Sequence, residues 1–144
     1  MNFVFLCAFC FFAIVHSKTL TADDLKKYYS CFVYECQDRT VGKKIDGCLE
    51  ILNPKEIQSY FQLLSNYHTF KSDSLEGKIS EYCTYDNDKK HNIFDKVIDT
   101  DFDFLKKASD EGNEGTQSRI TNYIMCKYNV LQNVLSEGKC QKES

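Results

Sequence analysis

Hydrophobic residues recur every three or four positions along most of the chain beyond its apolar N-terminus, which is the spacing of one buried helix face. In residues 21–36 this face contains Leu25, Tyr28 and Phe32, and Thr21 precedes it as a candidate N-cap. The segment therefore predicts an amphipathic helix that packs one face against a core.

The next two helices follow closely. Residues 41–52 carry apolar side chains at helical spacing and predict a short second helix. The strongest local signal comes after it, where Asn53 can cap a helix and Pro54 suits the first helical position. Glu56 stands where it can complete a capping box with Asn53. A third helix is therefore expected from Pro54 to about residue 68.

Polar stretches separate the remaining helices. A fourth helix is expected to start near Ser74, and the polar residues 85–92 predict a turn after it. Apolar positions within residues 93–98 predict a fifth helix. The pattern leaves open whether that helix continues through residues 99–108 or breaks there.

The C-terminal part predicts one long helix. Residues 109–116 are polar and acidic and contain two glycines, so they predict a mobile loop. Thr116 is a candidate N-cap for a last helix over residues 117–137, which Gly138 would end. The chain contains one proline and six glycines, too few for a turn-rich β-sandwich. The fold class expected is therefore all-α, a single-domain bundle of five or six helices.

The N-terminus resembles a secretory signal. Phe3–Val15 is an unbroken apolar run, too short to span a bilayer but typical of a signal-peptide core. Small residues near Ser17 predict cleavage after that position, although a buried N-terminal helix is the alternative. We therefore expect residues 1–17 to be a signal peptide and residues 18–144 to be the secreted domain. Cys7 and Cys10, which form a C-x-x-C pair, would leave with the signal.

Six cysteines remain beyond the predicted cleavage site. An even number of cysteines in an oxidising compartment predicts disulfides, here three. A zinc site is the alternative, but no C-x-x-C pair remains and no histidine follows at zinc-finger spacing. The expected disulfide residues are Cys31, Cys36, Cys48, Cys83, Cys126 and Cys140.

The pairing can be partly predicted from helix geometry. If the first two helices form a hairpin that turns near residues 39–40, Cys31 and Cys48 lie at equal distances from the turn and should bond. Cys126 and Cys140 should not pair, because a helix separates their Cα atoms by far more than the 7 Å that a disulfide allows.

Cys36 and Cys83 are then left to bond with Cys126 and Cys140, in an order that the sequence does not decide.

Charge excludes one class of partner. The net charge is −3, and residues 71–115 carry 12 acidic but only 7 basic side chains. A basic patch of the kind that binds nucleic acid is therefore not expected. The acidic stretch is most simply a solvated face.

Candidate catalytic or metal residues are few. His68 and His91 are the histidines of the expected secreted domain, and neither belongs to a local triad pattern. We expect His68 to be half-buried at a helix end and His91 to be solvated. No catalytic residue, metal ligand or cofactor is predicted.

The stretch from Asp99 to Asp110 has a calcium-loop outline, with Asp101 and Asp103 at the third and fifth positions. The sixth position is Phe104, where a calcium loop needs glycine, so calcium binding is not expected.

The pattern of six cysteines in a helical secreted chain resembles the insect odorant-binding proteins only in outline. Here 11 residues separate Cys36 from Cys48 and 13 separate Cys126 from Cys140, which departs from that family's spacing. The function expected is a secreted, non-catalytic, monomeric extracellular binding protein that carries a small apolar ligand, with binding residues unknown. The alternative is an effector of the kind found in venom, saliva or gland secretions, which would bind another extracellular protein.

Overall fold

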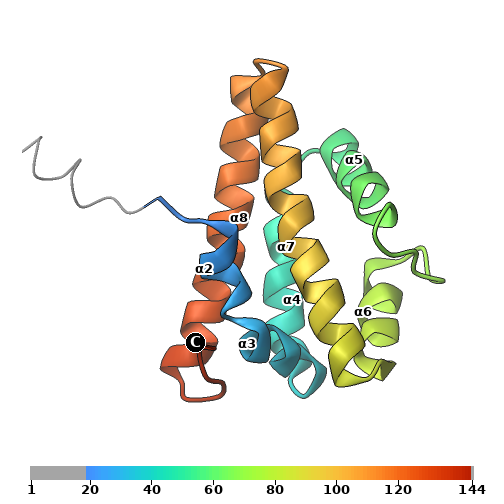
Figure 1. Cartoon of the computed structure of the whole chain (residues 1–144), viewed down its shortest axis with the longest axis vertical. Coiled ribbons are helices and arrows are strands. Elements are labelled where there is room, and N and C mark those ends of the chain that lie inside the picture. The colour runs from blue at the N-terminus through green and yellow to red at the C-terminus, as the bar shows by residue number, and fades with distance from the viewer. Residues whose placement is uncertain (1–18, 144) are drawn as a thin grey trace, which may run out of the picture.

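Two long antiparallel helices, α7 and α8, run side by side through the middle of the molecule (Figure 1). The shorter helices α2 and α3 lie against one side of this pair, and α5 and α6 lie on the other (Figure 1). The computed structural model describes residues 19–143, in which seven α-helices, two 3-10 helices and no strand occur. In chain order the elements are α2 (Ala22–Lys26), α3 (Tyr29–Val33), η1 (Tyr34–Cys36), α4 (Arg39–Cys48), η2 (Leu49–Ile51), α5 (Pro54–Ser65), α6 (Leu75–Thr84), α7 (Asn87–Asp110) and α8 (Glu114–Ser136).

The predicted all-α class is confirmed over this range. The predicted signal peptide, residues 1–17, lies outside the described residues. None of the helices between residues 19 and 143 has both the length and the apolar character needed to cross a membrane.

Several predicted helix ends are confirmed. Thr21 caps α2, and Asn53 caps α5 through a capping box with Glu56, whose backbone N–H lies 2.9 Å from Asn53 Oδ1. Ser74 caps α6, since its Oγ accepts a hydrogen bond from the Gly77 N–H at 3.0 Å. Gly138 ends α8 with a positive φ of 71°, a conformation that favours glycine.

Two predicted boundaries are wrong. The segment expected to form one helix over residues 21–36 is divided into α2, α3 and η1. This division explains why the described residues form seven α-helices and not the five or six expected. Residues 85–92 do not form a turn. Asp86 accepts a hydrogen bond from the Lys89 N–H at 2.8 Å and caps α7, which then continues unbroken through residues 99–108.

The connection between α7 and α8 is tighter than the loop expected over residues 109–116. Gly112 has a φ of 68°, and the N–H of Asn113 donates to the Ala108 carbonyl at 3.0 Å, which closes α7 with a Schellman motif. The side chain of Asn113 then accepts from the Thr116 N–H, so Asn113, and not Thr116, is the N-cap of α8.

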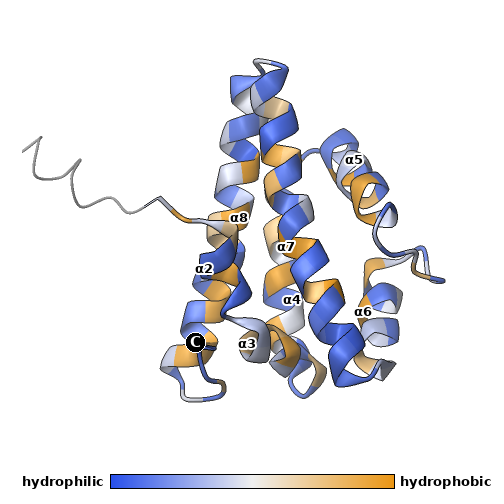
Figure 2. Ribbon diagram, in the orientation of Figure 1, coloured by the Kyte–Doolittle hydropathy of each residue, from blue (hydrophilic) through white to orange (hydrophobic). Residues whose placement is uncertain are grey.

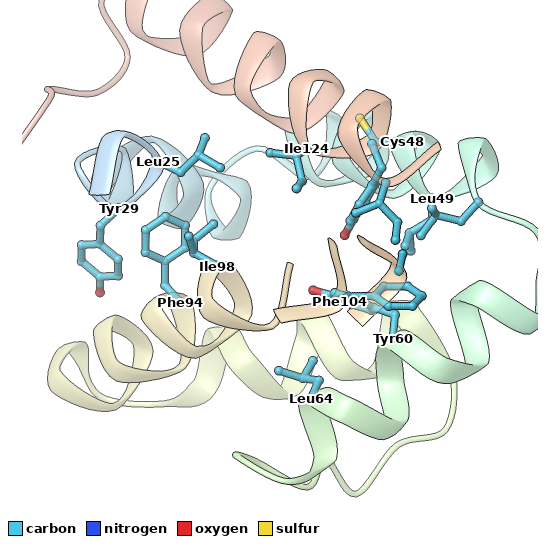
Figure 3. Close-up of a cluster of buried hydrophobic side chains, with 14 residues drawn as sticks. Leu25, Tyr29, Cys48, Leu49, Tyr60, Leu64, Phe94, Ile98, Phe104 and Ile124 are labelled. Atoms are coloured by element: carbon cyan, nitrogen blue, oxygen red, sulfur yellow. The ribbon is translucent and has the colours of Figure 1, made fainter. Parts of the chain in front are cut away.

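Apolar side chains from nearly every helix meet in the interior, and the outward faces are polar (Figure 2). The main cluster contains Leu25 from α2, Phe94 and Ile98 from α7, and Ile124 from α8, all of them buried (Figure 3). Because these residues come from distant parts of the sequence, the core closes only when the helices have assembled.

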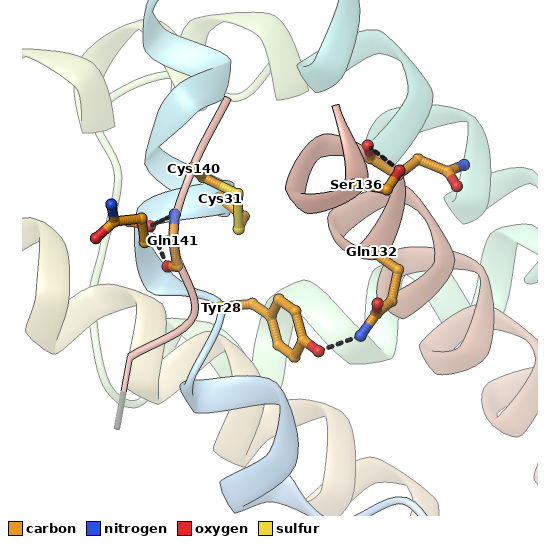
Figure 4. Close-up of a disulfide and its surroundings, with 8 residues drawn as sticks. Tyr28, Cys31, Gln132, Ser136, Cys140 and Gln141 are labelled. Atoms are coloured by element: carbon orange, nitrogen blue, oxygen red, sulfur yellow. Dashed lines mark hydrogen bonds between the residues drawn. A yellow bond between two sulfur atoms is a disulfide. The ribbon is translucent and has the colours of Figure 1, made fainter. Parts of the chain in front are cut away.

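All six cysteines of the described chain form disulfides. Cys31 bonds with Cys140, Cys36 with Cys83 and Cys48 with Cys126, and the Cα–Cα distances are 4.9, 5.5 and 5.7 Å. The first bond ties the C-terminal tail to α3, where Ser30 Oγ also donates to the Gln141 carbonyl at 2.6 Å (Figure 4).

The predicted Cys31–Cys48 bond is therefore wrong, and so is the separation of Cys36 from Cys83. The prediction assumed a simple hairpin of two helices. Instead α4 packs against α8, which brings Cys48 to Cys126, and the tail beyond α8 returns to α3 beside Cys31. The prediction that Cys126 and Cys140 do not bond with each other is confirmed.

One ion pair lies in the interior, between α7 and α8. Lys127 Nζ donates to Asp101 Oδ2, and the two side chains are 5 % and 0 % exposed. Burial alone would lower the pKa of Lys127, but attraction to Asp101 raises it above its ordinary value. Lys127 therefore stays charged and neutralises a carboxylate that water cannot reach.

We expect Lys127→Met to lower the free energy of unfolding by about 3–5 kcal/mol, because it leaves Asp101 buried without a counter-charge. The double variant Asp101→Leu, Lys127→Met should recover most of this loss. Urea denaturation at pH 7 measures the free energy of unfolding of both variants.

The matched control is Lys96→Met, because Lys96 forms only a partly exposed pair with Asp99 at 3.9 Å. Lys96→Met should lower the free energy of unfolding by less than about 1 kcal/mol. A Lys127→Met protein as stable as the wild type would contradict the importance of the buried pair.

Candidate functional site

A cavity of about 90 Å³ lies between the core and the pair α5–α6. Its lining is mostly apolar and aromatic, and it draws on η1, η2 and every α-helix except α2. The lining residues are Phe32, Glu35, Ile45, Asp46, Leu49, Tyr60, Phe61, Leu64, Phe70, Leu75, Lys78, Ile79, Tyr82, Ile93, Val97, Tyr123 and Lys127.

The cavity reaches the surface on the side of α6. All its lining residues between Phe70 and Ile79 are partly exposed, whereas Ile45, Tyr60 and Tyr123 on the opposite walls are buried. The disulfide between Cys36 and Cys83 joins η1 to the C-terminal end of α6 and so holds this wall in place.

Glu35 is the most unusual residue of the lining. It is only 1 % exposed, and within the described chain its carboxyl group forms no hydrogen bond or ion pair. Its close approach to α4 depends on Gly42, since a Cβ at that position would lie 3.2 Å from Glu35 Oε2. A polar group that is buried without a partner is costly, and such groups concentrate at functional sites.

Burial, and after it the nearby carboxylate of Asp46, raise the pKa of Glu35 to about 8, against the opposite effect of Arg39 and Lys127. Glu35 is therefore mostly protonated at pH 7. A neutral carboxyl group at the edge of an apolar cavity can donate a hydrogen bond, and it can ionise when a cation approaches.

The other charged lining residues differ in how well they are satisfied. Lys127 is bound to Asp101, and Lys78 Nζ donates to the backbone carbonyls of Ser72 at 2.9 Å and Asp73 at 2.7 Å. The side chain of Asp46 has no hydrogen-bond partner within the described part of the chain, and burial raises its pKa. The unsatisfied groups of the cavity are thus both carboxyls.

The two histidines singled out from the sequence lie outside this lining. His68 is partly buried, as expected, with its Nε2 3.1 Å from Tyr85 Oη. His91 is partly exposed and lies between Asp95 and Glu143, at 3.5 and 3.4 Å. Neither is brought to a nucleophile in a triad arrangement.

The candidate calcium ligands are spread around one helix and do not form a loop. Asp99 binds Lys26, Asp101 binds Lys127 and Asp110 binds Lys106. Across residues 19–143, no group of three or more acidic, histidine or cysteine side chains is arranged to hold a metal ion.

Sequence reasoning did not select Glu35, although a signal was present. Glu35 follows Tyr28 by seven residues and Phe32 by three, so it lies on the same helical face as those apolar residues. A carboxyl group on the inward face of an amphipathic segment is a reason to expect a buried functional group.

Comparison with known protein families, curated proteins and solved structures finds no significant match.

Glu35 makes the stability of the fold depend on pH. In the unfolded chain its carboxyl loses a proton near pH 4.5, but in the folded protein it keeps the proton up to about pH 8. Glu35 thus contributes most to stability below pH 4.5, and this contribution falls as the pH rises to 8.

We expect Glu35→Gln to remove this fall, so that the variant gains up to about 4 kcal/mol over the wild type between pH 4.5 and pH 8.5. Denaturant titrations of both proteins across this range provide the measurement. His68, whose pKa is lowered by burial, has the opposite slope but is common to both proteins. Parallel pH profiles for the two proteins would show that Glu35 ionises normally.

Proposed function

We propose that the chain is an extracellular carrier that binds a small, mainly apolar ligand in the cavity between α4, α5, α6 and α7. The observation that carries this proposal is the unpartnered carboxyl of Glu35 at the wall of an otherwise apolar and aromatic cavity. Ligand sites commonly have this composition, a hydrophobic lining with a few polar groups that orient the ligand.

The cavity is small. An apolar cavity of about 150 Å³ is sufficient to admit benzene, so about 90 Å³ suits a short chain or one end of a larger molecule. The partly exposed wall near α6 gives such a molecule a route in and allows its remainder to lie at the surface.

Three disulfides support the extracellular setting, since such bonds persist mainly in oxidising compartments. They cross-link segments up to 109 residues apart in the sequence. A carrier outside the cell meets proteases, and a fold that is cross-linked by disulfides resists unfolding and cleavage.

Little in the structure favours an effector that binds another protein. Among the large apolar side chains of residues 19–143, only Tyr67 and Met125 are exposed, at 47 % and 39 %; Tyr67 lies in the turn after α5, and Met125 lies on α8. Protein-binding surfaces usually present a contiguous apolar patch.

A non-catalytic role is part of the proposal. The cavity does bring two carboxyls and two lysines together, but both lysines are already bound to other groups of the protein. Within the described residues, its lining contains no serine, threonine, histidine or free thiol that could act as a nucleophile beside a base.

The test fills the cavity and follows the binding of hexan-1-ol by NMR chemical-shift titration. Val97→Phe on α7 adds a ring to the lining, and we expect it to weaken hexan-1-ol binding about tenfold or more. The matched control is Val130→Phe on α8, a partly exposed valine outside the cavity, which should leave binding unchanged. Equal binding to all three proteins would place the ligand elsewhere, and no binding to any of them would contradict the carrier proposal.

A further inference from the structure

We propose that the ligand of this cavity is a small primary amine with an apolar body, whose ammonium group binds to the carboxyls of Glu35 and Asp46. This inference rests on the proposed carrier function and names the chemical class of its ligand.

The first argument is the balance of unsatisfied groups. Both lysines of the lining are occupied, Lys127 by Asp101 and Lys78 by two backbone carbonyls. Glu35 and Asp46 have no hydrogen-bond donor from the described residues. A neutral carboxyl has one O–H to donate, but the pair together offers acceptors that an ammonium group, with three N–H donors, can satisfy.

The second argument is the aromatic lining. Rings from four helices surround the same space, and a cation is attracted to the face of an aromatic ring. Two lysines already use this attraction inside the lining, with Nζ of Lys127 at 4.6 Å from the ring centre of Tyr123 and Nζ of Lys78 at 5.2 Å from that of Phe61. The aromatic lining residues are Phe32, Tyr60, Phe61, Phe70, Tyr82 and Tyr123.

The third argument concerns the groups that face Glu35 from each neighbouring helix. Asp46 and Arg39 belong to α4, Lys127 to α8, and Tyr82 to α6. Arg39 is exposed and forms no ion pair within 4 Å in the described chain, and Lys127 is committed to Asp101. No cation of residues 19–143 therefore forms an ion pair with Glu35, and this place is open to a cation from the ligand.

Binding of the amine would be coupled to the release of one proton. The ammonium ion enters charged, Glu35 gives up its proton to solvent, and the carboxylate that forms pairs with the ammonium, so the cavity's charge balances. Because the free protein keeps this proton up to about pH 8, amine affinity should rise about tenfold per pH unit between pH 5.5 and 7.5. A neutral ligand of the same shape should show no such rise.

The experiment compares hexylamine, hexan-1-ol and hexanoate at pH 7 by isothermal titration calorimetry, in two buffers that differ in ionisation enthalpy. We expect hexylamine to bind about tenfold or more tightly than hexan-1-ol, with release of close to one proton. Hexanoate should bind most weakly. Hexylamine affinity measured from pH 5.5 to 7.5 should follow the predicted slope.

Glu35→Gln should lose about tenfold or more of the preference for hexylamine over hexan-1-ol. Glu50→Gln, which removes an exposed carboxyl outside the cavity, is the matched control and should bind both probes like the wild type. The pH slope and proton release are measured on the wild type, so they test the inference even if Glu35→Gln does not fold.

The outcomes separate the two proposals. If hexan-1-ol or hexanoate binds the wild type as tightly as hexylamine, the amine inference is wrong and the carrier proposal stands. If none of the probes binds, both are wrong. If Glu35→Gln retains the preference for hexylamine, or if binding releases no proton, Glu35 does not receive the ammonium group.

Discussion

Lys127 interacts with two buried carboxyl groups but is bound to only one of them. Its ammonium group is bound to Asp101 on α7, and Lys127 also lines the cavity that Glu35 lines. This arrangement determines the chemistry of the interior. Burial raises the pKa of Asp101, and the attraction and hydrogen bond of Lys127 oppose this rise, whereas Glu35 forms no ion pair among the described residues and keeps its proton to about pH 8. The carboxyl of Glu35 is thus unpaired because Lys127, the one buried lysine or arginine of residues 19–143, is bound to Asp101.

The disulfides hold the walls around this group. Cys36 directly follows Glu35 in the chain and bonds with Cys83, so the carboxyl is anchored next to the helix that forms the exposed wall. Cys48 and Cys126 join α4 to α8 one residue before Lys127. Two of the three covalent links therefore lie beside the charged groups of the cavity. Links at these positions limit how far the protein can relax to bring water or a counter-charge to Glu35.

Local signals in the sequence predicted local features well. Asn53, Pro54 and Glu56 specified the start of α5 because a capping box needs only neighbouring residues. Gly138 marked the end of α8 for the same reason. The polar run at residues 85–92 led to a wrong prediction of a turn. It is in fact an Asp N-cap followed by the charged first residues of α7, and this composition is also typical of a turn.

Long-range features could not be predicted in the same way. The Cys31–Cys140 bond depends on the return of the tail to α3, a contact between segments 109 residues apart. The candidate site also depends on long-range contacts, because Glu35, Asp46 and Lys127 line one cavity only through the packing of η1, α4 and α8. Periodicity placed Glu35 on an inward face, but only the assembled structure reveals that its neighbours leave it unpaired.

The claim on which the account depends is that Glu35 is neutral in the free protein at pH 7. Carbon-13 NMR of the glutamate side-chain carboxyls, with Glu35 assigned through the Glu35→Gln variant, measures this directly. The account predicts a Glu35 resonance that titrates near pH 8 in the free protein and remains in its ionised position at pH 6 when hexylamine is saturating. A Glu35 resonance that titrates near pH 4.5 in the free protein would contradict it.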